Sequence, residues 1–123
     1  MRYKILLTDS TYRDLKEIKT YITLNDEGVA KKYISKIFDK LNNLKYFPYI
    51  GHKISNSIFD YANCLYLPVM NHIAIYQINE LAKCIYIIRV LSHFQDWKDI
   101  INKDILSINK PIISDDVLSI VHM

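Results

Sequence analysis

Residues 64–91 read CLYLPVMNHIAIYQINELAKCIYIIRVL, and this stretch decides the fold. Three runs in it are rich in Ile, Val and Tyr, which is typical of β-strands: Leu65–Val69, Ile73–Ile78 and Cys84–Leu91. Only Met70 and Asn71 separate the first two runs, and residues 79–83 separate the last two. Such short connections join antiparallel neighbours, so the stretch predicts a three-stranded antiparallel meander.

Two amphipathic segments precede the meander and predict a helical hairpin. The first follows Asp9-Ser10-Thr11, whose side chains offer capping oxygens, and should form a helix of about 15 residues. A turn at Asn25-Asp26 then caps a second helix over roughly residues 27–46. Its apolar stripe, which we expect to pack in the core, consists of Ala30, Ile34, Ile37, Leu41 and Leu44.

The remaining segments complete the predicted order of elements. Residues 2–8 predict a strand, and Phe47–Gly51 ends the second helix, because proline cannot continue it and glycine supplies a turn. Residues 51–62 look irregular, a short helix should run from Asp96 to about Asp104, and Ser114-Asp115-Asp116 should cap a last one. We therefore expect an α+β fold. An antiparallel sheet, made of the N-terminal strand and the C-terminal meander, packs against a helical hairpin, and a short helical tail follows.

Charge divides the chain into two regions. Residues 1–103 carry 15 Lys/Arg and 10 Asp/Glu, whereas residues 104–123 carry one Lys and three Asp. A mildly basic body permits nucleic acid or an acidic protein as partner, although most lysines on such a surface simply solvate helix faces. We expect one domain over residues 1–103 and an extension over 104–123, whose apolar residues either pack on the domain or mediate a homodimer.

Composition also excludes several classes of protein. Cys64 and Cys84 allow at most one disulfide, the apolar run at the start is too short for a signal peptide, and no run of 18 apolar residues could cross a membrane. The histidines and cysteines lack the paired spacing of zinc ligands, and no glycine-rich phosphate loop occurs. The sequence thus predicts a cytoplasmic protein without metal or cofactor.

Four blocks in order resemble the RelE/ParE superfamily of toxins, also called the plasmid stabilisation protein family. They span roughly residues 3–98: Asp14–Ile22 (Asp-Leu-x-x-Ile-x-x-Tyr-Ile), Leu44–Gly51 (Leu-x-x-Phe-Pro-x-x-Gly), Leu67–Tyr76 (resembling Leu-Pro-Val-x-Asn-Tyr-x-x-x-Tyr, with His72 in place of the first tyrosine), and Ile87–Leu91 followed by Asp96-Trp97. The resemblance implies the fold expected above. It also implies the toxin of a type II toxin–antitoxin system, with a cognate antitoxin that wraps and neutralises it.

The resemblance leaves the mode of toxicity open. RelE-like members cleave mRNA on the ribosome, and this endoribonuclease activity is the one we expect here. ParE-like members instead inhibit DNA gyrase without catalysis, and a degenerate member would act only as an interaction protein. Tyr66 stands where relatives carry an arginine, which counts against RNA cleavage.

Cleaving RNA without a metal requires a proton acceptor, a cation at the phosphate and a proton donor. Arg89 matches the arginine of the family's last strand and could clamp a phosphate, or it could pair with a nearby acid such as Asp96. His93 matches a histidine that RNA-cleaving relatives use as acid or base. Candidate RNA contacts are His52, Lys53 and Tyr66.

Overall fold

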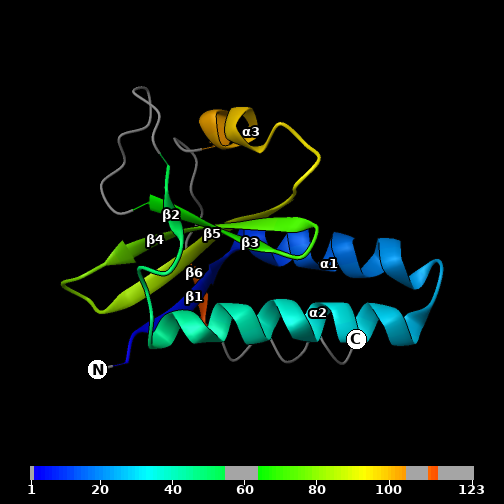
Figure 1. Ribbon diagram of the computed structural model, residues 1–123, viewed down its shortest axis with the longest axis horizontal. Helices are drawn as coiled ribbons and strands as arrows, with labels where there is room; N and C mark the ends of the chain where they lie inside the picture. Colours follow the sequence, from blue (N-terminus) through cyan, green and yellow to red (C-terminus); the bar gives the residue numbers. More distant parts are fainter. Residues whose placement is uncertain (1, 55–63, 105–110, 114–123) are drawn as a thin grey trace.

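The protein, described as a computed structural model over residues 2–54, 64–104 and 111–113, is built around a single sheet (Figure 1). The elements follow one another as β1 (Lys4–Thr8), α1 (Asp9–Thr23), α2 (Glu27–Asn42), the 3-10 helix η1 (Asn43–Lys45), β2 (His52–Lys53), β3 (Cys64–Val69), β4 (His72–Asn79), β5 (Cys84–Ser92), α3 (Trp97–Asp104) and β6 (Pro111–Ile113). The predicted α+β class is confirmed.

The sheet has the strand order β2-β3-β4-β5-β1-β6 and contains the predicted meander. β3 pairs antiparallel with β4, and β4 pairs antiparallel with β5. β1, however, lies parallel to β5, so the sheet is mixed and not antiparallel throughout as expected. The direction of β5 follows from the two antiparallel pairings of the meander, which make β5 run the same way as β3. The helical hairpin returns the chain to the start of β1, where the Tyr3 amide donates to the Lys45 carbonyl (3.0 Å).

The two faces of the sheet are covered by different helices (Figure 1). The α1–α2 hairpin packs on one face, and the predicted stripe of α2 is buried there, with exposed fractions of 2% or less for Ala30, Ile34, Ile37, Leu41 and Leu44. The short helix α3 covers the other face, where Trp97 and Ile100 pack against Ile73, Ile75 and Ile88. None of the helices in the described part of the chain is long and apolar enough to span a membrane.

Helix α1 begins directly at the end of β1, one residue earlier than its expected caps. Thr8 is the N-cap, and its side-chain oxygen accepts a hydrogen bond from the Thr11 amide (3.1 Å). The second helix starts as predicted, with the Asp26 carboxylate accepting from the Val29 amide (3.1 Å). It ends at Asn42 and continues as η1, a tighter turn common at helix ends.

Gly51 lies at a bend after the turn that follows η1, as predicted, but its φ is not positive, so the position needs a glycine for close packing and not for its backbone angles. A Cβ at this position would lie 2.5 Å from the hydroxyl of Tyr76 and 2.7 Å from the carbonyl oxygen of Tyr66. The buried Tyr76 hydroxyl accepts from the Gly51 amide (2.9 Å) and donates to the Pro48 carbonyl (2.8 Å). The Phe-Pro-x-x-Gly block therefore attaches the loop after η1 to the sheet.

Residues 111–113 add a strand that the sequence did not predict. β6 pairs antiparallel with the outer edge of β1, so this part of the extension packs on its own domain. The helix expected after Ser114-Asp115-Asp116 lies outside the described residues.

Ending the chain at residue 104 removes β6 and opens the edge of β1. We expect a lower melting temperature and a larger apparent mass in solution, because an open strand edge pairs with other chains. A chain ending at residue 113 keeps β6 and is the matched control, measured by scanning calorimetry and light scattering. Identical behaviour of the two shortened chains would contradict a protective role for β6.

Candidate functional site

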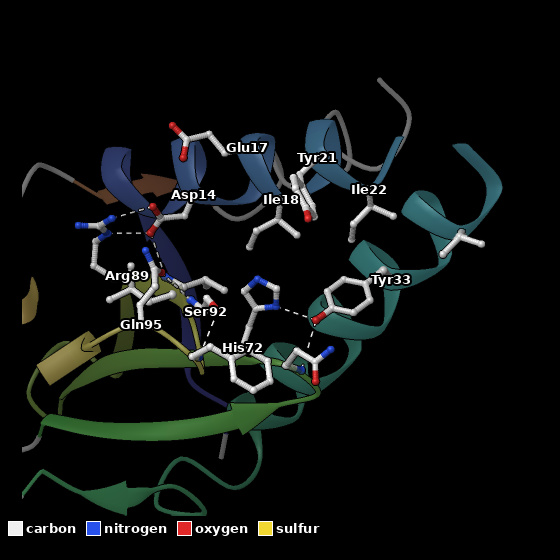
Figure 2. Close-up of a pocket in the computed structure, with 15 residues that line it drawn as sticks. Asp14, Glu17, Ile18, Tyr21, Ile22, Tyr33, His72, Arg89, Ser92 and Gln95 are labelled. Carbon is white, nitrogen blue, oxygen red and sulfur yellow. Dashed lines mark hydrogen bonds and ion pairs between the residues drawn. The ribbon is translucent and has the colours of Figure 1, made fainter. Parts of the chain in front are cut away.

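A groove opens where the far half of the hairpin faces the turn between β3 and β4 and the end of β5 (Figure 2). It encloses a cavity of about 830 Å³. Its walls are mainly apolar, with the polar side chains of Asp14, Glu17, His72 and Arg89 among them. The apolar lining includes Tyr21, Val29 and Phe94, whose exposed fractions are 72%, 52% and 82%. The groove thus offers a wide apolar surface with a small charged end.

The charged end consists of an ion pair between β5 and α1. Arg89 donates to both carboxylate oxygens of Asp14, at 2.7 Å from Nε and 2.9 Å from Nη2, and the Val90 amide donates to the same carboxylate (3.0 Å). Asp14 is buried, which raises the pKa of its carboxyl, while the hydrogen bonds from Arg89 and Val90 act in the opposite direction. The two-pronged geometry is that of a guanidinium holding a carboxylate.

A bulge in β5 explains why Arg89 reaches α1. The register shifts so that Arg89 faces Ile75 while Ile87 faces Tyr76, which leaves Ile88 as an extra residue. Bulges bend a strand and change the direction of the next side chain. The pairing of β1 with β5 ends at Ile87, at the same point, and α1 begins beside the uncovered edge.

Side chains of the β1–α1 junction form hydrogen bonds with the backbone groups of β5 at that edge, where no strand pairs with them. The Thr11 hydroxyl donates to the Ile87 carbonyl (2.6 Å), and the Thr8 hydroxyl donates to the Ile88 carbonyl (2.9 Å). Asp14 accepts from the Val90 amide, as described above. Because these contacts repeat along β5, they fix α1, one wall of the groove, to the sheet.

His72 lies in the middle of the groove, in contact with Tyr33. Its Nδ1 is 2.6 Å from the hydroxyl of Tyr33. That hydroxyl also accepts a hydrogen bond from the Asn71 amide (3.3 Å). Burial lowers the pKa of His72, and the negative charge of Asp14 partly offsets this.

Stability should therefore fall as the pH drops below neutral. The unfolded chain binds a proton at position 72 near the ordinary histidine pKa of about 6.5, and the folded chain does so only at lower pH. Protonation thus favours unfolding between these two pKa values. We expect His72→Asn, which does not titrate, to flatten the dependence of the melting temperature on pH between about 7.5 and 5.5. A slope equal to that of the wild type would contradict this assignment.

The two residues expected to act in catalysis lie in β5 and directly after it. Arg89 lines the groove, bound to Asp14 and not to Asp96, the sequence neighbour considered as a partner. His93 is exposed, and its ring contacts that of Phe94, at 5.7 Å between centroids. It is not among the residues that line the groove. Its backbone amide donates to the Asn71 carbonyl (2.8 Å), which closes the end of the β4–β5 pair.

The three candidate RNA contacts lie elsewhere, on β2 and β3. His52 faces Tyr66 across these strands, with ring centroids 5.2 Å apart, and Tyr66 packs at 4.9 Å against Trp97 of α3. Lys53 is exposed beside them. Tyr66 thus belongs to the sheet face under α3, whereas Arg89 reaches to the hairpin. In the described ranges, no three His, Cys, Asp or Glu side chains gather to hold a metal ion.

Sequence reasoning missed Asp14, Tyr33 and His72 as groove residues. Asp14 and His72 stood within the blocks that carry the resemblance, but their partners lie far along the chain: Asp14 meets Arg89, and His72 meets Tyr33. Spacing within one segment cannot reveal such pairs.

Comparisons with known proteins agree with this architecture. The family described as "ParE toxin of type II toxin-antitoxin system, parDE" matches residues 5–97. The toxin–antitoxin complex RelBE2 from Mycobacterium tuberculosis contains a chain with 16% identity, and the match covers 75% of this chain and 99% of that one at a TM-score of 0.54. The chromosomal ParDE toxin–antitoxin system from P. aeruginosa contains one with 18% identity, covering 74% and 96%, at a TM-score of 0.59. No curated protein matches the sequence.

Proposed function

Because the chain belongs to the ParE toxin family of type II toxin–antitoxin systems, we propose that it arrests growth by binding and inhibiting DNA gyrase, and not by cleaving RNA. Gyrase inhibition is the activity that the resemblance implies for ParE-like toxins. The proposal places the protein in the cytoplasm, where gyrase acts.

The engagement of Arg89 with Asp14 carries the proposal. A guanidinium that clamps the scissile phosphate must present its donors to the substrate, but two donors of Arg89 are directed at a carboxylate that is 8% exposed. If Arg89 turned these donors toward a substrate, the buried Asp14 carboxylate would keep only the Val90 amide of the three donors described above. Arg89 is therefore better suited to holding α1 on the sheet than to catalysis.

The distribution of the other candidates supports the same conclusion. Metal-independent cleavage needs an acid, a base and a cation around one phosphate. Tyr66 is packed by Trp97, and His93 does not line the groove that Arg89 lines. A toxin that acts by binding needs no acid, base and cation at one phosphate.

Two assays on the purified protein, freed from its antitoxin, test the proposal together. We expect gyrase to lose its supercoiling activity and mRNA 5′ ends in a reconstituted translation reaction to remain unchanged. His93→Ala, at an exposed position, is the control for RNA cleavage because the variant should fold. New in-frame ends that need ribosomes and disappear in this variant would overturn the proposal.

A second part of the proposal concerns the antitoxin. We infer that an apolar segment of a cognate antitoxin lies in the groove, since Tyr21, Val29 and Phe94 leave more apolar surface exposed than a solitary protein needs. A groove with apolar walls and one charged end fits an amphipathic segment. The two solved structures compared above belong to toxin–antitoxin systems, which supports such a partner.

Phe94→Ser tests this assignment. We expect at least a roughly tenfold loss of affinity for the antitoxin in titration calorimetry, because exposed aromatic side chains commonly anchor interfaces. Leu24→Ser is the matched control, since Leu24 is 79% exposed and does not line the groove. Equal affinities for the two variants would place the antitoxin elsewhere.

A further inference from the structure

Exposed apolar side chains also gather at the end of the molecule opposite the groove. We call this surface the aromatic end; it consists of Tyr46 (58% exposed), Phe47 (62%), Tyr49 (53%), Ile50 (59%) and Leu81 (100%). β4 runs between the two ends, from His72 in the groove to Asn79 beside the aromatic end. At about 3.4 Å per residue, the two surfaces lie more than about 20 Å apart.

Contacts between three segments of the chain hold the aromatic end together (Figure 1). The Tyr3 amide donates to the Lys45 carbonyl (3.0 Å), and the Lys4 amide donates to the Lys83 carbonyl (2.9 Å). The hydroxyls of Tyr3 and Tyr49 both donate to the carboxylate of Glu80, at 2.8 and 2.7 Å. The start of the chain, the loop after η1 and the turn between β4 and β5 therefore form one surface.

The loop that carries the aromatic rings is fixed to the sheet by hydrogen bonds. Tyr76 ties it to the sheet through the Pro48 carbonyl and the Gly51 amide. The rings of Tyr46 and Phe47 nevertheless point away from the core, because both stay more than half exposed. A tightly anchored loop that presents large apolar side chains to solvent is characteristic of an interaction surface.

The charges around the aromatic end indicate the chemistry of the partner. Arg2 and Lys4 are exposed and Lys45 is half-buried, and none of the three has an ion pair within the described residues. Glu80 also lies at this end, and it pairs with Lys83 (3.3 Å). The rim is therefore positively charged, which favours a partner with acidic residues around an apolar centre.

The aliphatic members of the surface distinguish a protein from other occupants. Ile50 and Leu81 cannot stack on bases, so nucleic acid would leave much of the surface unused. A second copy of this chain would bring the same cations against Arg2, Lys4 and Lys45, which disfavours self-association. An acidic protein surface satisfies both the apolar centre and the rim.

We propose that the aromatic end binds the protein target of the toxin through an apolar patch bordered by acidic residues. The identity of the target as gyrase rests on the proposed function. The antitoxin would occupy the groove at the other end, so the two partners use separate surfaces.

The variant Phe47→Ser/Ile50→Ser tests the inference. We expect at least a tenfold higher concentration for half-maximal inhibition of gyrase and loss of growth arrest on expression, with melting temperature and antitoxin affinity unchanged. Leu24→Ser, at a position that is 79% exposed and lies on neither surface, should behave as the wild type. Arg2→Glu/Lys4→Glu, which leaves the apolar residues intact, should weaken inhibition in a way that depends on salt.

Each outcome decides the matter. Full activity of the folded Phe47→Ser/Ile50→Ser variant overturns the inference. The inference also fails if this variant loses activity only because it is less stable, as its melting temperature would show, while Arg2→Glu/Lys4→Glu stays fully active. If the wild type arrests growth but spares gyrase, the proposed function fails. The growth assay then still decides whether the aromatic end carries the toxicity. Binding of single-stranded DNA that disappears in these variants would replace a protein target by nucleic acid.

Discussion

Arg89→Ala is expected to lower the free energy of unfolding by about 3 kcal/mol, because it leaves a buried carboxylate without its counter-ion. The side chains of Arg89 and Asp14 are only 19% and 9% exposed, so the carboxylate depends on this partner more than a surface carboxylate would. The same change should loosen α1, since Asp14 would keep only the Val90 amide of its described donors. Chemical denaturation followed by circular dichroism measures the effect.

Two further variants separate the ion pair from nonspecific damage. Asp14→Ala/Arg89→Ala should cost less than the sum of the single changes, because no charge remains buried. Lys31→Ala removes the exposed pair with Glu27, at 3.9 Å, and should cost less than about 0.5 kcal/mol. A stable Arg89→Ala variant that no longer arrests growth would contradict the structural role and return Arg89 to direct contact with substrate.

Gly51→Ala is expected to cost about 2 to 3 kcal/mol, because the new methyl group would overlap two atoms of the sheet. The nearest are the Tyr76 hydroxyl at 2.5 Å and the Tyr66 carbonyl oxygen at 2.7 Å. The latter is main chain and cannot rotate away. Moving the loop to relieve the overlap would break the hydrogen bond between the Gly51 amide and Tyr76. The loss appears as a lower denaturation midpoint.

Gly28→Ala is the matched control for this substitution. Gly28 lies in the first turn of α2, where alanine favours the helix, and the added Cβ would meet the Asp26 carboxylate at 3.3 Å. These effects oppose each other, so the change should stay within about 0.5 kcal/mol. In a Tyr76→Phe background, Gly51→Ala should cost less than in the wild type. An equal cost in both backgrounds would assign the strain to the Tyr66 carbonyl oxygen and not to the Tyr76 hydroxyl.

Elements with a local pattern could be predicted from the sequence. The stripe from Ala30 to Leu44 defined the buried face of α2, and the short connections at Met70-Asn71 and at residues 79–83 defined the meander. When one face of a helix or strand is buried, its apolar residues recur at a regular spacing. This spacing can be recognised in the sequence without knowing what the helix or strand packs against. For the same reason Asp26 was identifiable as a cap.

Features that depend on distant pairing could not be predicted. The parallel pairing of β1 with β5, the addition of β6 and the bulge at Ile88 are properties of strand neighbours, which leave no period in a single segment. The partner of Arg89 was sought at Asp96 because that residue is close in sequence. The bulge instead directs Arg89 to Asp14, which lies 75 positions earlier.

The attachment of α1 to β5 has a consequence for the kinetics of the groove. Thr8 ends β1 and caps α1 at once, and Thr11 and Asp14 continue the contact along β5, so no hinge separates the wall of the groove from its floor. A partner then meets a preorganised surface and pays little to reshape it. Association should proceed without a slow opening step, and the lifetime of the complex should be set by the rate at which the partner dissociates.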